Sequence, residues 1–305
     1  MIALVALVLV GAWLVLMRVR AARIEAASLA RVARSSSGIV PGAESIVLAG
    51  DGHRAILLLH GGGDTPQTLR ELATVLNARG FTVHAPLLPA HGRTVKEFAN
   101  ASAADLLRSA REAYAALRAT HEWVGVIGLS MGGALAVRIG AEHPELPALG
   151  LAAPYLVVPP IVKRLARTAP LWGWAVPYLR GQQRGQSIQD DAVRAASLAY
   201  GIFTPAFLRA LADTVEGAWE ALPRVSSPTL VLQSREDNRI SPESASAAFE
   251  RLGASVKELV WLSGMGHVIT VDHGRERVFA KLAEWMERYE SAPAPSEGSR
   301  GATTT

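Results

Sequence analysis

The chain has 305 residues, half of them hydrophobic, so it can bury a sizeable core and wholesale disorder is excluded. Lys and Arg number 31 against 27 Asp and Glu, and residues 18–34, with five Arg and one Glu, already account for the net charge of +4. Because the rest of the chain is electrically balanced, no nucleic-acid-binding face is expected. The absence of cysteine excludes disulfides, thiolate zinc sites and iron–sulfur clusters.

The first feature along the chain is an apolar segment, Ile2–Met17, of 16 residues without a charge. At about 1.5 Å per residue, a helix of this length measures about 24 Å, so it can cross the roughly 30 Å hydrocarbon layer of a bilayer that thins slightly. No Lys or Arg precedes the segment, whereas Arg18, Arg20 and Arg23 follow it. By the positive-inside rule, the sequence predicts a single-pass transmembrane anchor over residues 1–20 with the rest of the chain in the cytoplasm.

Two other interpretations of this segment stay open. A cleaved signal peptide would carry basic residues before the apolar run, but here the order is reversed. A buried helix of a soluble protein would need cover on every side, because the segment is apolar all round. The helical pattern continues towards a Ser- and Gly-rich break at 35–38, and residues 21–43 are predicted to link the anchor to the next domain.

After this linker, β-rich apolar runs alternate with helical patterns. Strands and helices in repetition, with strands apolar on both faces, predict an α/β fold in which helices cover both sides of a mainly parallel sheet. Strands are predicted over 45–50, 55–60, 81–86, 123–128, 149–154, 229–234 and 256–261, and helices over 67–80, 104–119, 131–143, 243–253 and 275–289.

The segment 155–224 interrupts this alternation. It has no good pattern for a central strand, several prolines fragment it, and it is rich in aromatic residues. This composition predicts a helical cap inserted between two parts of one α/β core, residues 44–154 and 225–290. Residues 291–305 are rich in small and polar residues and are predicted to form a solvated tail.

A G-x-S-x-G sequence, Gly128 to Gly132, lies between a predicted strand and a predicted helix. Small residues on either side of Ser130 allow the sharp turn that exposes its hydroxyl at the end of a strand. The N-terminus of the following helix favours negative charge there. A glycine-rich turn with a serine that caps the helix would have the same sequence, so the motif alone does not identify a nucleophile.

Two further residues favour the catalytic interpretation. Asp237 and His267 each follow a predicted strand, at the edge where open parallel sheets bind ligands. With Ser130 they give the chain order serine, acid, histidine that nucleophile-elbow hydrolases require. An imidazole can take the serine proton, and a carboxylate can fix the tautomer of the imidazole and stabilise its cation. The sequence therefore predicts a Ser130–His267–Asp237 triad.

The anionic oxygen formed on an attacked carbonyl needs backbone donors. The glycines 61–63 end an apolar strand, so the N–H of Gly62 can pair with that of Met131, the residue after the serine. His60 is predicted to anchor this loop rather than to act in catalysis. No grouping of His and carboxylates has metal-ligand spacing, so neither a metal nor another cofactor is predicted.

These motifs resemble those of the α/β-hydrolase superfamily and, within it, the bacterial carboxylesterases and monoacylglycerol lipases. The resemblance spans about residues 55–288 and implies the α/β-hydrolase fold. The similar segments are 57–65, 81–94, 128–133, 233–245 and 263–272.

The resemblance also implies roles for single residues. Ser130 would be the nucleophile, His267 the base and Asp237 the orienting acid, with Gly62 and Met131 as oxyanion donors. Two features depart from the family: many relatives have a bulky residue where this chain has Gly62, and few have an N-terminal anchor.

Four polar residues near these motifs are expected to have other roles. By resemblance, His91 would brace the rim of the site. Glu236 is expected on the surface, and Asp272 and His273 are expected to cap the last helix.

The expected function is a membrane-anchored serine hydrolase that cleaves carboxylic esters, with monoacylglycerol or a related lipid as substrate. The aromatic insertion would supply an apolar acyl pocket. A thioesterase or a serine peptidase would use the same triad, and a non-catalytic lipid-binding scaffold would need none of it. The sequence identifies neither the acyl chain length nor a protein partner.

Overall fold

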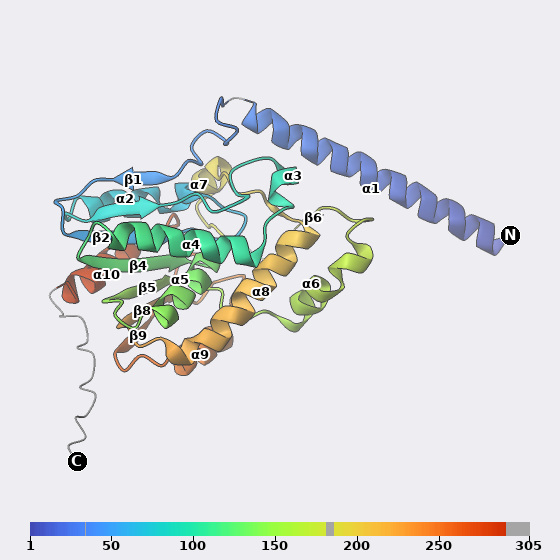
Figure 1. The fold of residues 1–305 in the computed structure, drawn as a ribbon. Coiled ribbons are helices and arrows are strands. Elements are labelled where there is room, and N and C mark those ends of the chain that lie inside the picture. Colours follow the sequence, from blue (N-terminus) through green and yellow to red (C-terminus); the bar gives the residue numbers. More distant parts are fainter. Residues whose placement is uncertain (34, 181–185, 291–305) are drawn as a thin grey trace, which may run out of the picture.

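A central sheet organises the computed structural model, which describes residues 1–33, 35–180 and 186–290 (Figure 1); the predicted tail at 291–305 lies outside them. Within these residues the sheet has seven strands in the order β1-β3-β2-β4-β5-β8-β9. β1 pairs antiparallel with β3, and the other neighbours are parallel. The strands are β1 (Ile46–Leu48), β2 (Arg54–Leu59), β3 (Thr82–Ala85), β4 (Trp123–Leu129), β5 (Leu149–Ala152), β8 (Thr229–Ser234) and β9 (Lys257–Leu262).

Helices cover both faces of this sheet, which confirms the α/β prediction (Figure 1). On one face, α2 (Arg70–Asn77) and α10 (Arg275–Arg288) pack over a core that contains the apolar strand residues of that face, such as Ile56, Leu58 and Ile127. On the other face lie α4 (Ala103–Arg118), α5 (Met131–Glu142) and α9 (Pro242–Arg251). Four of these helices begin and end within two residues of their predicted ranges. The predicted helix 67–80 begins as a 3-10 turn, η1 (Pro66–Leu69), and α2 ends three residues early, at Asn77.

The insertion at 155–224 is helical, as its composition predicts. It contains α6 (Pro160–Trp172), α7 (Asp191–Ala196), α8 (Pro205–Ala221) and the turn η2 (Leu222–Arg224). α8 packs on α6 along one side and on α4 and α5 along the other, so it joins the insertion to the core. A small antiparallel sheet of β6 (Leu179–Arg180) and β7 (Ile202–Phe203), and the short helix α3 (Val95–Phe98), were not predicted.

The N-terminal helix α1 (Ile2–Val32) runs well beyond the predicted anchor. Its most apolar stretch is long and hydrophobic enough to cross a membrane and is not buried at all, which distinguishes it from a core helix. Figure 1 shows the N-terminal half of α1, which contains this stretch, projecting away from the domain. Its second half packs on the domain, with Ala21, Ser28 and Val32 buried. The beginning of the predicted linker 21–43 is therefore helical.

Candidate active site

Ser130 occupies the turn between β4 and α5. Its backbone has φ 53° and ψ −117°, a conformation that residues other than glycine rarely adopt. The neighbouring glycines allow the chain segments to come this close: a Cβ at Gly128 would lie 2.2 Å from the carbonyl oxygen of Gly132, and a Cβ at Gly132 would lie 2.0 Å from that of Leu59. The motif therefore has the sharp strand–turn–helix geometry that a nucleophile elbow requires.

The three residues predicted to form a triad meet in the structure. The Ser130 hydroxyl Oγ lies 2.8 Å from His267 Nε2, and His267 Nδ1 lies 2.8 Å from Asp237 Oδ2. They follow the carboxyl ends of β4, β8 and β9, as the sequence indicates. With Nδ1–H donating to the carboxylate, Nε2 is free to accept the hydroxyl proton.

The surroundings of Asp237 keep its carboxylate charged. Burial by itself would raise its pKa, since the side chain has no exposed surface. Attraction to His267 and hydrogen bonds from His267 and from the backbone N–H groups of Arg239 and Ile240 outweigh burial, so the pKa of Asp237 is lowered. The Gln233 amide also donates to Oδ2, at 2.8 Å. An ionised carboxylate in this position can stabilise an imidazolium.

The glycine loop 61–63 lies directly against the serine. A Cβ at Gly61 would be 3.9 Å from Ser130 Oγ. The backbone N–H groups of Gly62 and Met131 have no hydrogen-bond acceptor within the described part of the chain. Both are thus available to an oxygen held beside Ser130, which is the arrangement needed to stabilise a tetrahedral intermediate.

The glycine at position 62 has a structural reason. A Cβ at this position would lie 2.7 Å from the ring of Phe207 and 3.2 Å from the sulfur of Met131. Phe207 belongs to α8 and is completely buried. The aromatic ring from the insertion therefore fills the space that a larger side chain would need.

Two buried histidines hold the glycine loop. His91 Nε2 accepts the N–H of Gly63 at 3.0 Å, and His60 Nε2 accepts the N–H of Leu88 while its Nδ1 donates to the Gly61 carbonyl. Burial lowers the pKa of His91 to about 4; burial together with repulsion from His91 lowers that of His60 to about 3. Both rings are thus neutral, and the predicted anchoring and bracing roles are confirmed.

A segment of the insertion also holds this loop, a contact that no sequence pattern indicates. The N–H of Tyr200 donates to the Gly63 carbonyl at 3.0 Å. The Gln67 amide donates to the Ala196 carbonyl at 3.0 Å and accepts the Leu198 N–H at 2.9 Å. We call residues 196–200 the cap strap. It attaches the insertion to the loop that presents Gly62.

Asp64, directly after the glycines, is a buried acid that the sequence analysis missed. Its carboxylate accepts hydrogen bonds from the Thr65 N–H at 2.8 Å and the Thr68 hydroxyl at 2.9 Å. Burial nevertheless raises its pKa to about 6. A sequence signal was present, since a charged residue follows an otherwise apolar strand and loop.

The prediction that Asp272 and His273 cap the last helix is wrong. α10 begins after Gly274, which has φ 71°, and no side chain caps it. The imidazole of His273 is largely exposed. Asp272 is completely buried, because its carboxylate has other partners.

Those partners attach the histidine loop to the insertion. The Asp272 carboxylate accepts the N–H of Gly266 at 2.7 Å, and Gly266 immediately precedes His267. It also accepts the N–H groups of Gln189 at 2.8 Å and Asp190 at 2.9 Å. Asp272 is therefore a structural residue that positions the loop of His267.

The remaining acid near the triad behaves as predicted. Glu236 is exposed and accepts hydrogen bonds from the Ser234 hydroxyl and the Gly264 N–H, both at 3.2 Å. Among residues 1–33, 35–180 and 186–290, no group of three His, Asp or Glu side chains could hold a metal ion.

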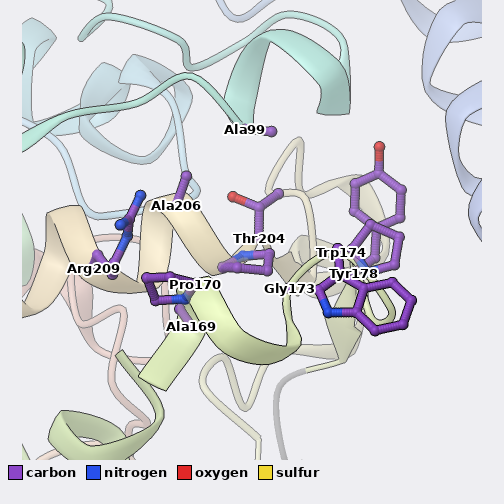
Figure 2. Close-up of a pocket in the computed structure, with 11 residues that line it drawn as sticks. Ala99, Ala169, Pro170, Gly173, Trp174, Tyr178, Thr204, Ala206 and Arg209 are labelled. Atoms are coloured by element: carbon purple, nitrogen blue, oxygen red, sulfur yellow. The ribbon is translucent and has the colours of Figure 1, made fainter. Parts of the chain in front are cut away.

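A separate cavity of about 300 Å³ lies in the insertion (Figure 2). Trp174 and Tyr178 lie on one side of it and Arg209 lies on the other. None of the triad residues lines it. Thr204 to Ala206 form part of its wall and lead directly to Phe207, whose ring lies against Gly62.

Comparison with known proteins identifies a family and similar proteins over most of the chain. The family model described as serine aminopeptidase S33 matches residues 50–274. A carboxylesterase of Bacillus subtilis is 27% identical over 238 residues, which cover 78% of this chain and 94% of the relative. A thermostable monoacylglycerol lipase of Bacillus sp. H-257 is 28% identical over 252 residues, covering 82% and 97%. A solved structure from work on the metagenome-derived lipolytic enzymes LipS and LipT is 30% identical, with a TM-score of 0.75 and coverage of 82% and 99%.

Proposed function

This chain belongs to the serine aminopeptidase S33 family of α/β hydrolases, and from that premise we propose that it is a serine hydrolase which cleaves carboxylic esters through an acyl-enzyme. The observation that carries the proposal is the pair of 2.8 Å contacts joining Ser130, His267 and Asp237. Nothing in binding alone demands this arrangement, which disfavours a scaffold without catalysis.

Acylation would begin when His267 Nε2 takes the proton of Ser130 and Oγ attacks the ester carbonyl. The carbonyl oxygen becomes anionic and accepts hydrogen bonds from the N–H groups of Gly62 and Met131. Asp237 stabilises the imidazolium. His267 then gives its proton to the leaving alcohol, the C–O bond of the ester breaks, and the acyl group stays on Ser130.

Deacylation would repeat the sequence with water. His267 takes a proton from the water as its oxygen attacks the acyl-enzyme, and the same two N–H groups bind the second oxyanion. His267 then returns the proton to Ser130 Oγ as the acid leaves, so the enzyme regains its starting state.

Monoacylglycerol or a related lipid ester is the substrate class that we propose. A carboxylesterase and a monoacylglycerol lipase are among the relatives over most of their length. The insertion is rich in aromatic residues, as suits the binding of an acyl chain, and it packs against the glycine loop through the buried ring of Phe207 beside Gly62. Apolar pockets discriminate chain length weakly, by about 1–3 kcal/mol per methylene, so tolerance of different acyl chains is expected.

We further propose that α1 spans the membrane once, with the catalytic domain on the cytoplasmic side. Its apolar half is exposed, and Arg18, Arg20 and Arg23 follow it. A cleaved signal peptide would instead leave a shortened protein in the soluble fraction. Separation of the membrane and soluble fractions, followed by mass measurement of the protein in each, distinguishes the two.

The alternative activities follow from the family description, which names an aminopeptidase, and from the generality of the triad. Full-length protein in detergent micelles should be compared on monoacylglycerols and nitrophenyl esters, acyl thioesters, and aminoacyl anilides, with Ser130→Ala as control. We expect kcat/KM to be highest for the esters and to be lost in the variant. A higher kcat/KM for the anilides or thioesters would overturn the ester assignment.

A further inference from the structure

The insertion exposes apolar side chains on one side. Outside α1, the described residues expose six large hydrophobic side chains, and four of them belong to α6 and the loop after it. These are Ile161, Leu165, Leu171 and Trp174, with 63%, 39%, 77% and 63% of their surface exposed. Such a concentration on one element indicates a contact surface rather than scattered surface residues.

α6 is amphipathic, with one side packed on the domain and the other side exposed. Its Ala166 and Ala169 are buried, and Ala166 packs with Val162 against Leu208 and Ala212 of α8. The opposite side is in solvent. A helix with one buried side and an exposed side of mixed apolar and basic residues can lie in a bilayer interface.

The charge of this region is one-sided. Between Glu145 and Asp190 the chain has no acidic residue but five Lys or Arg, three of them on α6. Lys163 pairs with Glu216, whereas Arg164 and Arg167 are exposed and form no ion pair within the described residues. An anionic surface is the complementary partner, because exposed basic residues are attracted to anionic lipid headgroups.

The position of α1 places this side of the molecule at the membrane. Arg18, which immediately follows the apolar segment, donates to the Trp174 carbonyl at 3.2 Å. Further along α1, Glu25 accepts the Tyr178 hydroxyl at 2.9 Å and pairs with Lys96 at 3.0 Å. In Figure 1, α6 lies on the side towards which the N-terminal half of α1 extends. Trp174 is therefore at the depth where α1 would leave the bilayer, a depth that Trp prefers.

We propose that α6 and the following loop form a second membrane-binding surface that docks on an anionic lipid bilayer. We call it the cap face, and its residues are Ile161, Arg164, Leu165, Arg167, Leu171 and Trp174. The inference rests on the proposed membrane attachment of α1 and not on the catalytic assignment. Docking would place the cavity of Figure 2 against the lipid, since Trp174 belongs both to its wall and to the cap face.

The absence of cysteine allows a direct test. Full-length Leu171→Cys, labelled with an environment-sensitive fluorophore, is reconstituted into vesicles of equal parts phosphatidylcholine and phosphatidylglycerol. Val47→Cys on β1 is the matched control, since Val47 is 69% exposed. Quenchers attached to lipid chains should quench the label at 171 several-fold more than the label at 47, and aqueous iodide should do the reverse. Equal quenching at both positions would overturn the proposal.

A second arm tests the choice of partner. Adding Arg164→Glu and Arg167→Glu to the labelled Leu171→Cys protein should reduce lipid quenching several-fold. Quenching of labelled Leu171→Cys itself should fall when the vesicles are pure phosphatidylcholine. Unchanged quenching in both experiments would contradict an anionic partner. Protection of position 171 from iodide in lipid-free micelles, increasing with protein concentration, would identify a second copy of the chain instead. Because Ser130→Ala can carry the same label, this result is independent of hydrolysis.

Discussion

At the scale of single residues, the site depends on what each buried histidine nitrogen contacts. Both ring nitrogens of His60 and of His91 contact backbone groups, and burial lowers the pKa of each ring. His267 differs, because Nδ1 contacts a carboxylate and Nε2 contacts a hydroxyl. Of these three histidines, His267 is thus the one placed to transfer a proton to and from Ser130.

Asp237→Asn tests the orienting acid. An amide in place of the carboxylate favours the wrong tautomer of His267 and does not stabilise its cation, so kcat should fall by about 10⁴ with a small change in KM. Steady-state hydrolysis of a nitrophenyl ester measures both. Glu236→Gln, next to it but exposed, is the control and should keep full activity. A loss in Asp237→Asn smaller than about tenfold would contradict the assigned role.

Asp64→Asn tests the cost of a buried charge. The carboxyl has its ordinary pKa of 3.8 in the unfolded chain and a pKa of about 6 in the folded protein. The folded state therefore binds this proton more tightly, and its stability falls as the pH rises from about 4 to about 6. Asn does not ionise, so the variant should unfold at a higher temperature than wild type at about pH 8, and the gain should vanish near pH 4.

Thermal unfolding over this pH range measures the effect. Asp213→Asn, at an exposed position on α8, is the control and should leave the profile unchanged. A pH-independent difference between Asp64→Asn and wild type would show that the carboxyl does not have a raised pKa in the folded protein.

At the scale of elements, the insertion is fastened to both sides of the site. The cap strap bonds to the glycine loop through Tyr200 and Gln67, and Asp272 bonds the histidine loop to residues 189–190. On its outer side, the cap strap receives a hydrogen bond from Arg31 of α1 to the Leu198 carbonyl, at 2.9 Å. The proposed oxyanion donors and the proposed base are thus positioned by contacts with the same segment of the chain.

Asp272→Asn should weaken this connection. The carboxylate accepts several backbone N–H groups, and an amide NH₂ facing them leaves at least one without an acceptor. We expect a loss of about 2 kcal/mol in unfolding free energy, or a fall in Tm of roughly 4–8 °C. His273→Ala is the matched control and should have little effect, since its ring is exposed. An unchanged Tm in Asp272→Asn would contradict the structural role.

The second half of α1 should matter for stability in the same way. Ser28 Oγ accepts the N–H of Val95, the first residue of α3, at 2.8 Å, and Val32 packs with Val40 and Ala43. A chain that begins at Arg18 keeps these contacts, whereas a chain that begins at Ser35 loses them. Thermal unfolding should give the first a Tm several degrees above the second. Equal Tm values would show that this half of α1 is dispensable for folding.

At the scale of the whole molecule, helices and strands with a periodic pattern of apolar residues could be predicted from the sequence. Very short elements, and contacts between residues far apart in the chain, could not. The strands and the five longer core helices follow from patterns of apolar residues. α3 has four residues and β6 and β7 have two each, too few to show a period. The triad was predictable because chemistry restricts its residue types and strand ends restrict its place. Gln189 and Asp190, which join Asp272 to the insertion, lie more than 80 residues before it in the chain, and no local pattern indicates these contacts.

The central claim is that Ser130 is the nucleophile of an esterase, and active-site labelling tests it most directly. Full-length protein is treated with a fluorophosphonate probe, and the modified peptide is identified by mass spectrometry. We expect a single modified residue, Ser130, with no labelling in Ser130→Ala and strongly slowed labelling in His267→Ala, because the base is lost. Labelling that persists in Ser130→Ala, or that maps to another residue, would contradict the account.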